Sequence, residues 1–166
     1  MEQASYKSET IFMQKIVFIL SCLISLHATA QNNSTSQTKY FNVNKNIAVD
    51  GYDVVAYFKQ NKAVKGDKKY AVSHQGIVYF FSSEANKNSF LKSPLTYEPQ
   101  YGGWCAYAMG AKGTKVEIDP ETFKIKDGKL YLFYNKTFTN TLPLWNKDEA
   151  NLKTKADANW QAILSK

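Results

Sequence analysis

Alternating hydrophobic and polar residues in the middle of the chain predict a β-hairpin. Residues 70–73 and 77–81 have the composition of strands, and His74-Gln75-Gly76 between them suits a tight connection between antiparallel strands. This pattern places His74 at the tip of the hairpin. We expect an exposed turn histidine there, and a metal ligand or proton carrier is the less favoured alternative.

A second hairpin and a long helix are predicted in the C-terminal part. Phe123 and Ile125 alternate with lysines, Asp127-Gly128 is a strong signal for a two-residue turn, and 130–134 forms the return strand. Hydrophobic residues then recur at helical spacing and predict an amphipathic helix that docks on the sheet: Leu152, Ala156, Trp160, Ile163 and Leu164.

A turn followed by a short helix is predicted at 50–58. Asp50-Gly51 is a turn signal, and Asp53 precedes the apolar residues at a position where its carboxylate can cap the helix N-terminus. Metal ligation by the two carboxylates is the alternative. We favour the turn and cap roles.

A further helix is predicted after the first hairpin. Ser82 or Ser83 can cap this helix, which ends before Pro94 and directs Phe90 and Leu91 toward the core. The elements together predict an α+β fold, in which a small antiparallel sheet of two hairpins is packed by several helices on one side.

The N-terminal 30 residues have the pattern of a signal peptide. Lys15 precedes an apolar run at 16–26, and a small-x-small cleavage pattern follows at 28–30. The run is too short to span a bilayer, which needs about 20 apolar residues. Met13 is an alternative start, and lipoprotein processing at Cys22 is a less favoured route. We therefore expect export to the periplasm or the exterior.

Cleavage after residue 30 leaves a polar, flexible leader at 31–39 and one domain at 40–166. It removes Cys22, so Cys105 is the single thiol of the mature chain and cannot form an internal disulfide. An unpaired thiol in an oxidising compartment is unusual enough to mark a candidate site. A buried, inert cysteine that packs as a small hydrophobe is the alternative.

Composition limits the classes of partner. The chain is 44% hydrophobic and 21% charged, as expected for an ordinary globular domain. Its net charge of +7 comes from lysine alone, because the sequence contains no arginine. Arginine is the residue best suited to forked contacts with phosphates and bases, so its absence argues against a nucleic-acid site. A lysine-rich surface is instead weakly attracted to anionic envelopes.

The segment around the thiol is the most unusual in the chain. Gly102 and Gly103 permit backbone geometry denied to other residues, and 104–109 reads as one or two helical turns that stop at Gly110. Cys105 is thereby predicted in the first turn, where the helix dipole favours a thiolate. The residues predicted to shape the site are Gly102, Gly103, Trp104, Tyr101, Asp50 and Asp53.

A soft metal ion is one ligand that this segment suggests. Met109 lies four residues after Cys105 and would share its helical face. Thiolate and thioether donors suit copper more than zinc or calcium, and His74 is a third candidate ligand. Met109 as a core residue is the alternative that we favour.

The sequence resembles the exported branch of the YHS-domain family. The resemblance covers nearly all of the mature chain. It rests on Asp50-Gly51-Tyr52-Asp53, Val55-Ala56-Tyr57-Phe58, Tyr79-Phe80-Phe81-Ser82-Ser83, Pro99-Gln100-Tyr101-Gly102-Gly103-Trp104-Cys105-Ala106-Tyr107-Ala108, Ile118-Asp119-Pro120, Asp127-Gly128-Lys129-Leu130-Tyr131-Leu132 and Ala156-Asp157-Ala158-Asn159-Trp160.

This resemblance implies a link to metal handling. Cysteine-rich members of the family carry two cysteines at positions that match Ser82 and Asn86, and this chain has neither. The exported branch instead keeps the cysteine that corresponds to Cys105, and some relatives carry selenocysteine there. The resemblance therefore implies a reactive or ligating position at Cys105.

Three hypotheses for function follow. The favoured one is a non-enzymatic envelope protein that holds copper, or zinc, at or near Cys105. The second is thiol redox chemistry, in which Cys105 cycles through a sulfenic acid or a mixed disulfide. The third is a non-catalytic interaction module in which Cys105 only packs. Hydrolase activity is disfavoured, because His74 is the sole histidine of the mature chain and no nucleophile elbow or phosphate loop is present.

Overall fold

The largest sheet has four strands in the order β1-β2-β4-β3. They are β1 (Val43–Asn44), β2 (Ile47–Ala48), β3 (Asp67–His74) and β4 (Ile77–Phe81). The sequence predicted the antiparallel β3–β4 pair, but it gave no sign that β2 pairs with β4 in parallel. The computed structural model describes residues 38–166, so the predicted signal peptide and most of the leader lie outside the described residues.

The turn between β3 and β4 is one residue shorter than predicted. His74 is the last residue of β3 and pairs with Ile77. Only Gln75 and Gly76 form the loop, with φ angles of 51° and 80°. Two positive φ angles are what a type I′ turn requires, and its twist matches that of the flanking strands. The prediction that His74 lies at the hairpin tip is therefore wrong.

Two further hairpins follow in the C-terminal half. β5 (Asp119–Lys126) and β6 (Lys129–Phe133) form the predicted antiparallel pair, joined by the predicted Asp127-Gly128 turn. A small hairpin of β7 (Asn135–Lys136) and β8 (Thr139–Asn140) comes next and was not predicted. The α+β class expected from the sequence is confirmed.

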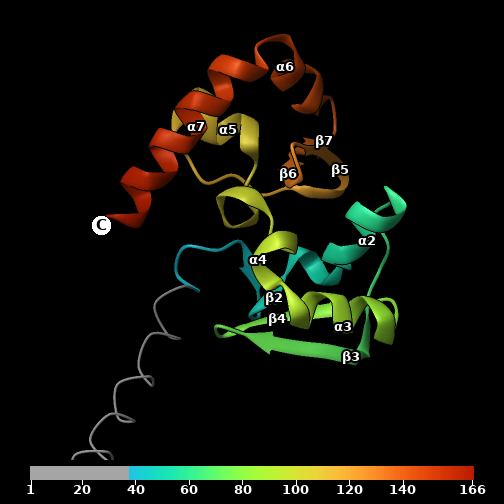
Figure 1. The fold of residues 1–166 in the computed structure, drawn as a ribbon. Coiled ribbons are helices and arrows are strands. Elements are labelled where there is room, and N and C mark those ends of the chain that lie inside the picture. The colour runs from blue at the N-terminus through green and yellow to red at the C-terminus, as the bar shows by residue number, and fades with distance from the viewer. Residues whose placement is uncertain (1–37) are drawn as a thin grey trace, which may run out of the picture. The chain divides into compact units, whose positions relative to one another are not determined.

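The helices of the described residues lie on one side of the β3–β4 hairpin (Figure 1). Two of them are short 3-10 helices, η2 (Val49–Gly51) and η3 (Gln100–Gly103). The α-helices are α2 (Val54–Gln60), α3 (Glu84–Lys92), α4 (Pro94–Tyr97), α5 (Ala106–Lys112), α6 (Leu142–Lys147) and α7 (Glu149–Leu164).

The predicted caps of α2 and α3 are confirmed. The Asp53 carboxylate accepts the N–H groups of Val55 and Ala56 at the start of α2, and the Ser83 hydroxyl caps α3. Phe90 of α3 is buried as expected. Leu91 is 53% exposed, so its predicted core position is wrong. The two residues are adjacent on the helix and point in directions about 100° apart, so only one can face the core.

Gly110 lies inside α5 and does not end it. The helix continues to Lys112 and ends at Gly113, whose φ of 64° is typical of a helix C-terminus. A Cβ atom at position 110 would lie 2.4 Å from the carbonyl oxygen of Leu152 on α7. The backbones of α5 and α7 therefore approach closely at Gly110, which explains a glycine within a helix.

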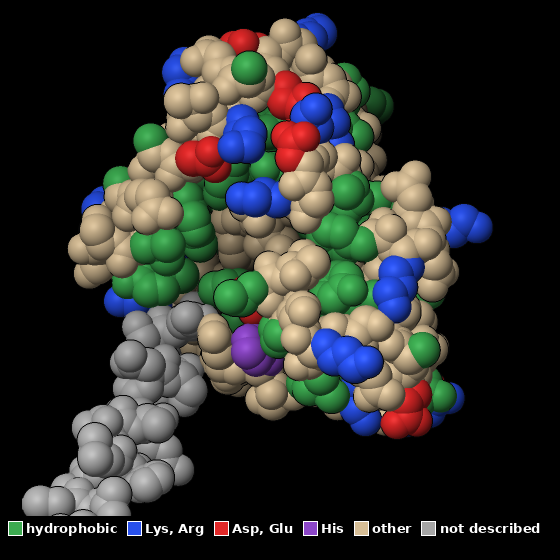
Figure 2. All heavy atoms as spheres, viewed as in Figure 1, with side chains coloured by type: hydrophobic (Ala, Val, Ile, Leu, Met, Phe, Trp, Pro, Cys, Tyr) green, Lys and Arg blue, Asp and Glu red, His purple; other side chains and the backbone are tan. Residues whose placement is uncertain are grey.

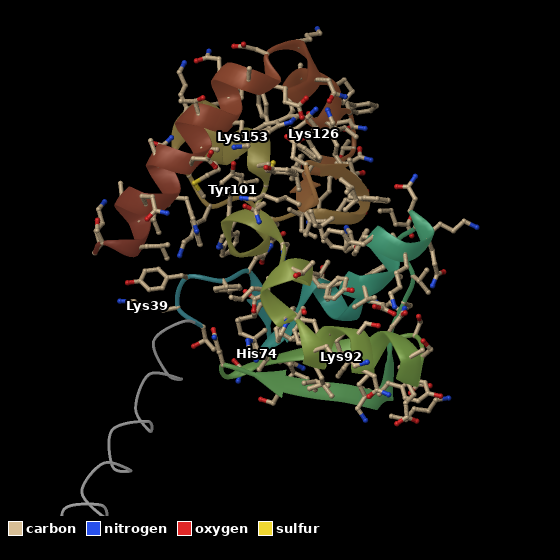
Figure 3. The ribbon with its side chains drawn as sticks, viewed as in Figure 1. Lys39, His74, Lys92, Tyr101, Lys126 and Lys153 are labelled. Atoms are coloured by element: carbon tan, nitrogen blue, oxygen red, sulfur yellow. The ribbon has the colours of Figure 1, made fainter. Side chains whose placement is uncertain are left out.

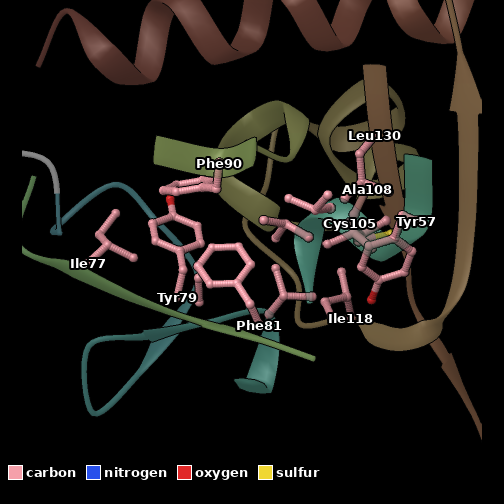
Figure 4. Packing of buried hydrophobic residues seen from close by; sticks show 14 residues of the cluster. Tyr57, Ile77, Tyr79, Phe81, Phe90, Cys105, Ala108, Ile118 and Leu130 are labelled. Carbon is pink, nitrogen blue, oxygen red and sulfur yellow. The ribbon is translucent and has the colours of Figure 1, made fainter. Parts of the chain in front are cut away.

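Two groups of buried residues form the core. The first lies between the four-stranded sheet and α2, α3 and β6 and includes Phe81, Phe90 and Cys105 (Figure 4). The second lies where α7 crosses α5 and includes Met109 and Trp145. The predicted stripe of α7 thus packs chiefly against α5, with β6 contributing Tyr131 and Phe133 to the same group.

Candidate functional site

The Gly-Gly turn that precedes the thiol is η3. Tyr101 and Gly102 have φ angles of 56° and 60°, a conformation that costs a tyrosine more than a glycine. The N–H of Asn42 donates to the carbonyl of Gly102 at 2.8 Å, and the Asn42 side-chain amide donates to the carbonyl of Gly103 at 3.2 Å. These two hydrogen bonds therefore hold the segment that leads into β1 against the η3 turn.

Trp104 also holds the N-terminal segment against the η3 turn. Its indole N–H donates a 2.6 Å hydrogen bond to the carbonyl of Tyr40. The side chain itself is half-buried. Trp104 and the two glycines therefore shape the N-terminal segment, in addition to preceding the thiol in sequence.

Cys105 stands directly before α5, because the helix begins at Ala106, two residues later than predicted. It occupies the N-cap position, but its side chain makes no capping hydrogen bond to the helix. The side chain is fully buried and belongs to the same group as Ile118 and Leu130 (Figure 4). The thiol thus faces the core and does not face the free N–H groups of the helix.

A closed set of hydrogen bonds surrounds the sulfur. The N–H of Tyr134 donates to Cys105 Sγ at 3.3 Å, and the Thr141 hydroxyl oxygen lies 3.4 Å from the sulfur. The Thr141 hydroxyl donates to the Tyr134 carbonyl at 2.9 Å. A hydroxyl has one hydrogen, so the thiol is the donor in its contact with Thr141. This arrangement satisfies a neutral thiol.

Met109 is buried in a different core group from Cys105. Its side chain belongs to the second core group, with Phe133 and Trp145, whereas Cys105 belongs to the first. The role of Met109 in the described structure is core packing, the alternative that the sequence favoured.

His74 lies at the far end of the first core group from Cys105. Its strand partner Ile77 and the thiol occupy opposite sides of Figure 4. The imidazole meets the ring of Phe90 edge-on, with centroids 5.8 Å apart, and its Nε2 is 3.6 Å from a carboxylate oxygen of Glu98. The structure therefore does not bring together the three residues predicted to ligate a metal.

Glu98 is a functional candidate that sequence reasoning missed. Its side chain is only 14% exposed. Burial raises the pKa of Glu98, while the charge of His74 and the hydroxyl of Tyr79 act to lower it. The buried Tyr79 hydroxyl has no hydrogen-bond partner in the described structure, so it acts on Glu98 through space. The sequence did carry a signal for this residue: a glutamate between Tyr97 and Pro99, in a segment rich in aromatic residues.

Glu98 opens onto a pocket of about 580 Å³ that we call the η3–α7 pocket. The pocket is bounded by the N-terminal segment, the β3–β4 turn, α4, η3, the start of β6 and the last turns of α7. It lies on the face that carries His74 in Figures 2 and 3, where hydrophobic side chains border a hollow. The lining residues are Tyr40, Phe41, Gln75, Leu95, Glu98, Pro99, Gln100, Tyr101, Gly102, Lys129, Asp157, Trp160, Gln161 and Leu164.

Asp50 and Asp53 have separate structural roles. Asp50 is exposed, with a φ angle of 49° in the η2 turn. Asp53 is fully buried, and its two oxygens accept five hydrogen bonds. The donors are the N–H groups of Val55, Ala56 and Ser82, the Ser82 hydroxyl and the Asn86 amide. These contacts agree with the turn and cap roles that the sequence favoured.

The described residues offer no ready-made metal centre and no membrane span. Between residues 38 and 166, no three His, Cys, Asp or Glu side chains are grouped so that they could hold a metal ion. Within the same range, no helix is both long and apolar enough to cross a bilayer.

Comparisons with known proteins found no match for this chain among family models, curated proteins or solved structures. The resemblance to YHS domains stays a prediction from the sequence.

Proposed function

We propose that this chain is a small, exported, non-enzymatic binding protein of the cell envelope, and that its ligand occupies the η3–α7 pocket. The observation that carries the proposal is the pocket itself. Its volume of about 580 Å³ falls in the range of small-molecule sites, roughly 300–1,000 Å³. Segments far apart in the sequence converge on it with aromatic rings and polar side chains, the combination typical of such sites.

The walls of the pocket are held in place before any ligand arrives. The hydroxyl of Tyr101 donates to the Asp157 carboxylate at 2.9 Å and ties η3 to α7. The ring of Trp160 lies edge-on to the ring of Tyr101, with centroids 6.5 Å apart. Rigid walls reduce the entropy lost on binding, which favours recognition of a ligand over a purely structural role.

Retention of a natural ligand tests this proposal. The whole chain is expressed in its own host, and the protein is isolated from the envelope fraction and measured by native mass spectrometry. We expect an added mass on the wild-type protein that is lost in Trp160→Ala. Phe138→Ala is the matched control, because Phe138 is fully exposed and does not line the pocket. Equal ligand content in both variants, or no added mass in any of them, contradicts the proposal.

Soft-metal binding at Cys105 is the second candidate function. Cys105 is a free cysteine, and its sulfur accepts a backbone N–H from Tyr134. The donor set suggested by the sequence does not fit one ion, because Met109 lies in the other core group and His74 contacts Glu98. A copper ion would need to enter the core and take further donors from a partner.

Native mass spectrometry after Cu(I) loading tests this second candidate. A mass gain of one copper that is lost in Cys105→Ser and kept in His74→Gln supports it. Equal copper content in wild type and Cys105→Ser rules it out.

A further inference from the structure

We propose that the η3–α7 pocket binds a neutral oligosaccharide, which lies against the Trp160 ring and is hydrogen-bonded by three glutamine amides. This inference rests on the proposed binding function and names its ligand class. A sugar ring has apolar faces of C–H groups and a rim of hydroxyls, and each hydroxyl donates one hydrogen bond and accepts others. A complementary site needs flat rings beside neutral groups that both donate and accept.

Trp160 supplies a fixed flat surface. The indole is half-buried at the end of α7, and Tyr101 supports it edge-on. A Cβ atom at position 102 would lie 2.9 Å from Trp160 Cη2, so the ring packs directly on the backbone of the Gly102 turn. Tyr40 and Phe41 add two half-buried rings to the same lining.

Three glutamine side chains face the pocket from three different elements. Gln75 belongs to the β3–β4 turn, Gln100 to η3 and Gln161 to α7. In the described structure, none of their side-chain amides takes part in the hydrogen bonds that tie the fold together. A side-chain amide offers two hydrogen-bond donors and an acceptor. These amides are therefore complementary to sugar hydroxyls, which also donate and accept hydrogen bonds.

Each carboxylate that lines the pocket lies beside a basic side chain. Asp157 accepts hydrogen bonds from the Tyr101 hydroxyl and from Lys153 Nζ, the latter at 2.8 Å. Glu98 faces His74, and Lys129 adds an exposed positive charge. A basic side chain lies beside each carboxylate, so a cation finds no unopposed carboxylate in the pocket. Lys129 has no acidic partner among the described residues, but it is exposed, so solvent and salt weaken its attraction for an anion. A neutral ligand is therefore favoured.

Isothermal titration of the protein isolated from the envelope fraction tests the inference. The probes are cellotriose, maltotriose and tri-N-acetylchitotriose, with tetramethylammonium chloride and inorganic phosphate as ionic controls. We expect at least one trisaccharide to bind with a Kd of about 1 mM or tighter, and neither ion to compete with it. Failure of all three trisaccharides overturns the inference, and so does stronger binding of either ion.

Variants locate the bound sugar. Trp160→Phe keeps a ring and is expected to weaken binding about threefold, while Trp160→Ala weakens it at least tenfold. Gln161→Leu is expected to weaken binding about tenfold, since a sugar hydroxyl loses its partner. Gln60→Leu is the matched control, because Gln60 is exposed at the end of α2 and outside the pocket. Sugar binding that is unchanged in Trp160→Phe and Gln161→Leu overturns the inference.

The two proposals fail in different ways. A natural ligand that depends on Trp160 but is not a saccharide would overturn the saccharide assignment and leave the binding function in place. A protein that carries no Trp160-dependent ligand and binds no trisaccharide would overturn both.

Discussion

The side-chain amide of Asn86 donates a 2.7 Å hydrogen bond to the carboxylate of Asp53, 33 residues earlier in the chain. Ser82 adds two more hydrogen bonds to the same oxygen, from its N–H and its hydroxyl. The positions at which the family resemblance implies a cysteine pair therefore converge here on a buried carboxylate. They link the end of β4 and the start of α3 to the start of α2.

Asp53→Ala is expected to lower the free energy of unfolding by about 3 kcal/mol, because it removes a helix cap and leaves buried donors without a partner. Asn86→Ala removes one donor and is expected to cost about 1–2 kcal/mol. Urea unfolding followed by circular dichroism measures both. Asp67→Ala at an exposed carboxylate is the control, and a similar loss in that variant would contradict the assignment.

Glu98→Gln is expected to stabilise the protein more at neutral pH than at acidic pH. Burial holds the folded-state pKa of Glu98 above its ordinary value of 4.5. Below the ordinary value the carboxyl is protonated in both states. As the pH rises toward the raised pKa, the unfolded chain gives up its proton first, so the wild-type protein loses stability that the glutamine variant keeps.

Unfolding measured at a series of pH values checks this prediction. The difference in unfolding free energy between Glu98→Gln and wild type should grow as the pH rises through the window above 4.5 and then level off. Replacing His74 with glutamine should raise the Glu98 pKa further, because the charge of His74 lowers it. The difference in unfolding free energy should then grow over a wider range of pH. A difference that does not vary with pH would show that Glu98 is not destabilised by burial.

Cys105 is expected to be unreactive in the folded protein. Its sulfur is fully buried and hydrogen-bonded, so 5,5′-dithiobis(2-nitrobenzoic acid) should label it only in urea. Cys105→Ala leaves the N–H of Tyr134 without its partner and is expected to cost about 1–3 kcal/mol. Rapid labelling of the native protein would favour the thiol redox hypothesis instead.

Gly110→Ala is expected to destabilise the protein by about 1–3 kcal/mol, although alanine favours a helix. The added methyl would meet the Leu152 carbonyl oxygen and push α5 and α7 apart. Thermal unfolding measures the effect. Gly128→Asn is the control, since nothing lies within 4 Å of a Cβ atom there and asparagine tolerates a positive φ angle. Equal melting temperatures for Gly110→Ala and wild type would contradict the close approach of the two helices.

Local features of this chain were within reach of the sequence. The Asp127-Gly128 turn, the Ser83 cap and the Asp53 cap each depend on atoms a few residues apart, so their side-chain chemistry is enough to predict them. The hydrophobic stripe of α7 was predicted for the same reason. The prediction that this stripe docks on the sheet was wrong in its main partner, which is α5. Periodicity identifies a buried face without identifying what covers it.

The sequence by itself determined the α+β class and both main hairpins. Tertiary structure alone decided that the thiol is sealed by Tyr134 and Thr141, that His74 faces Glu98, and that Gly110 lies inside a helix. It also assembled the η3–α7 pocket from residues as distant as Tyr40 and Trp160. The physical reason is the separation along the sequence of the residues that interact. Turns and caps form between neighbouring residues, whereas burial and pocket shape depend on which distant segments pack together.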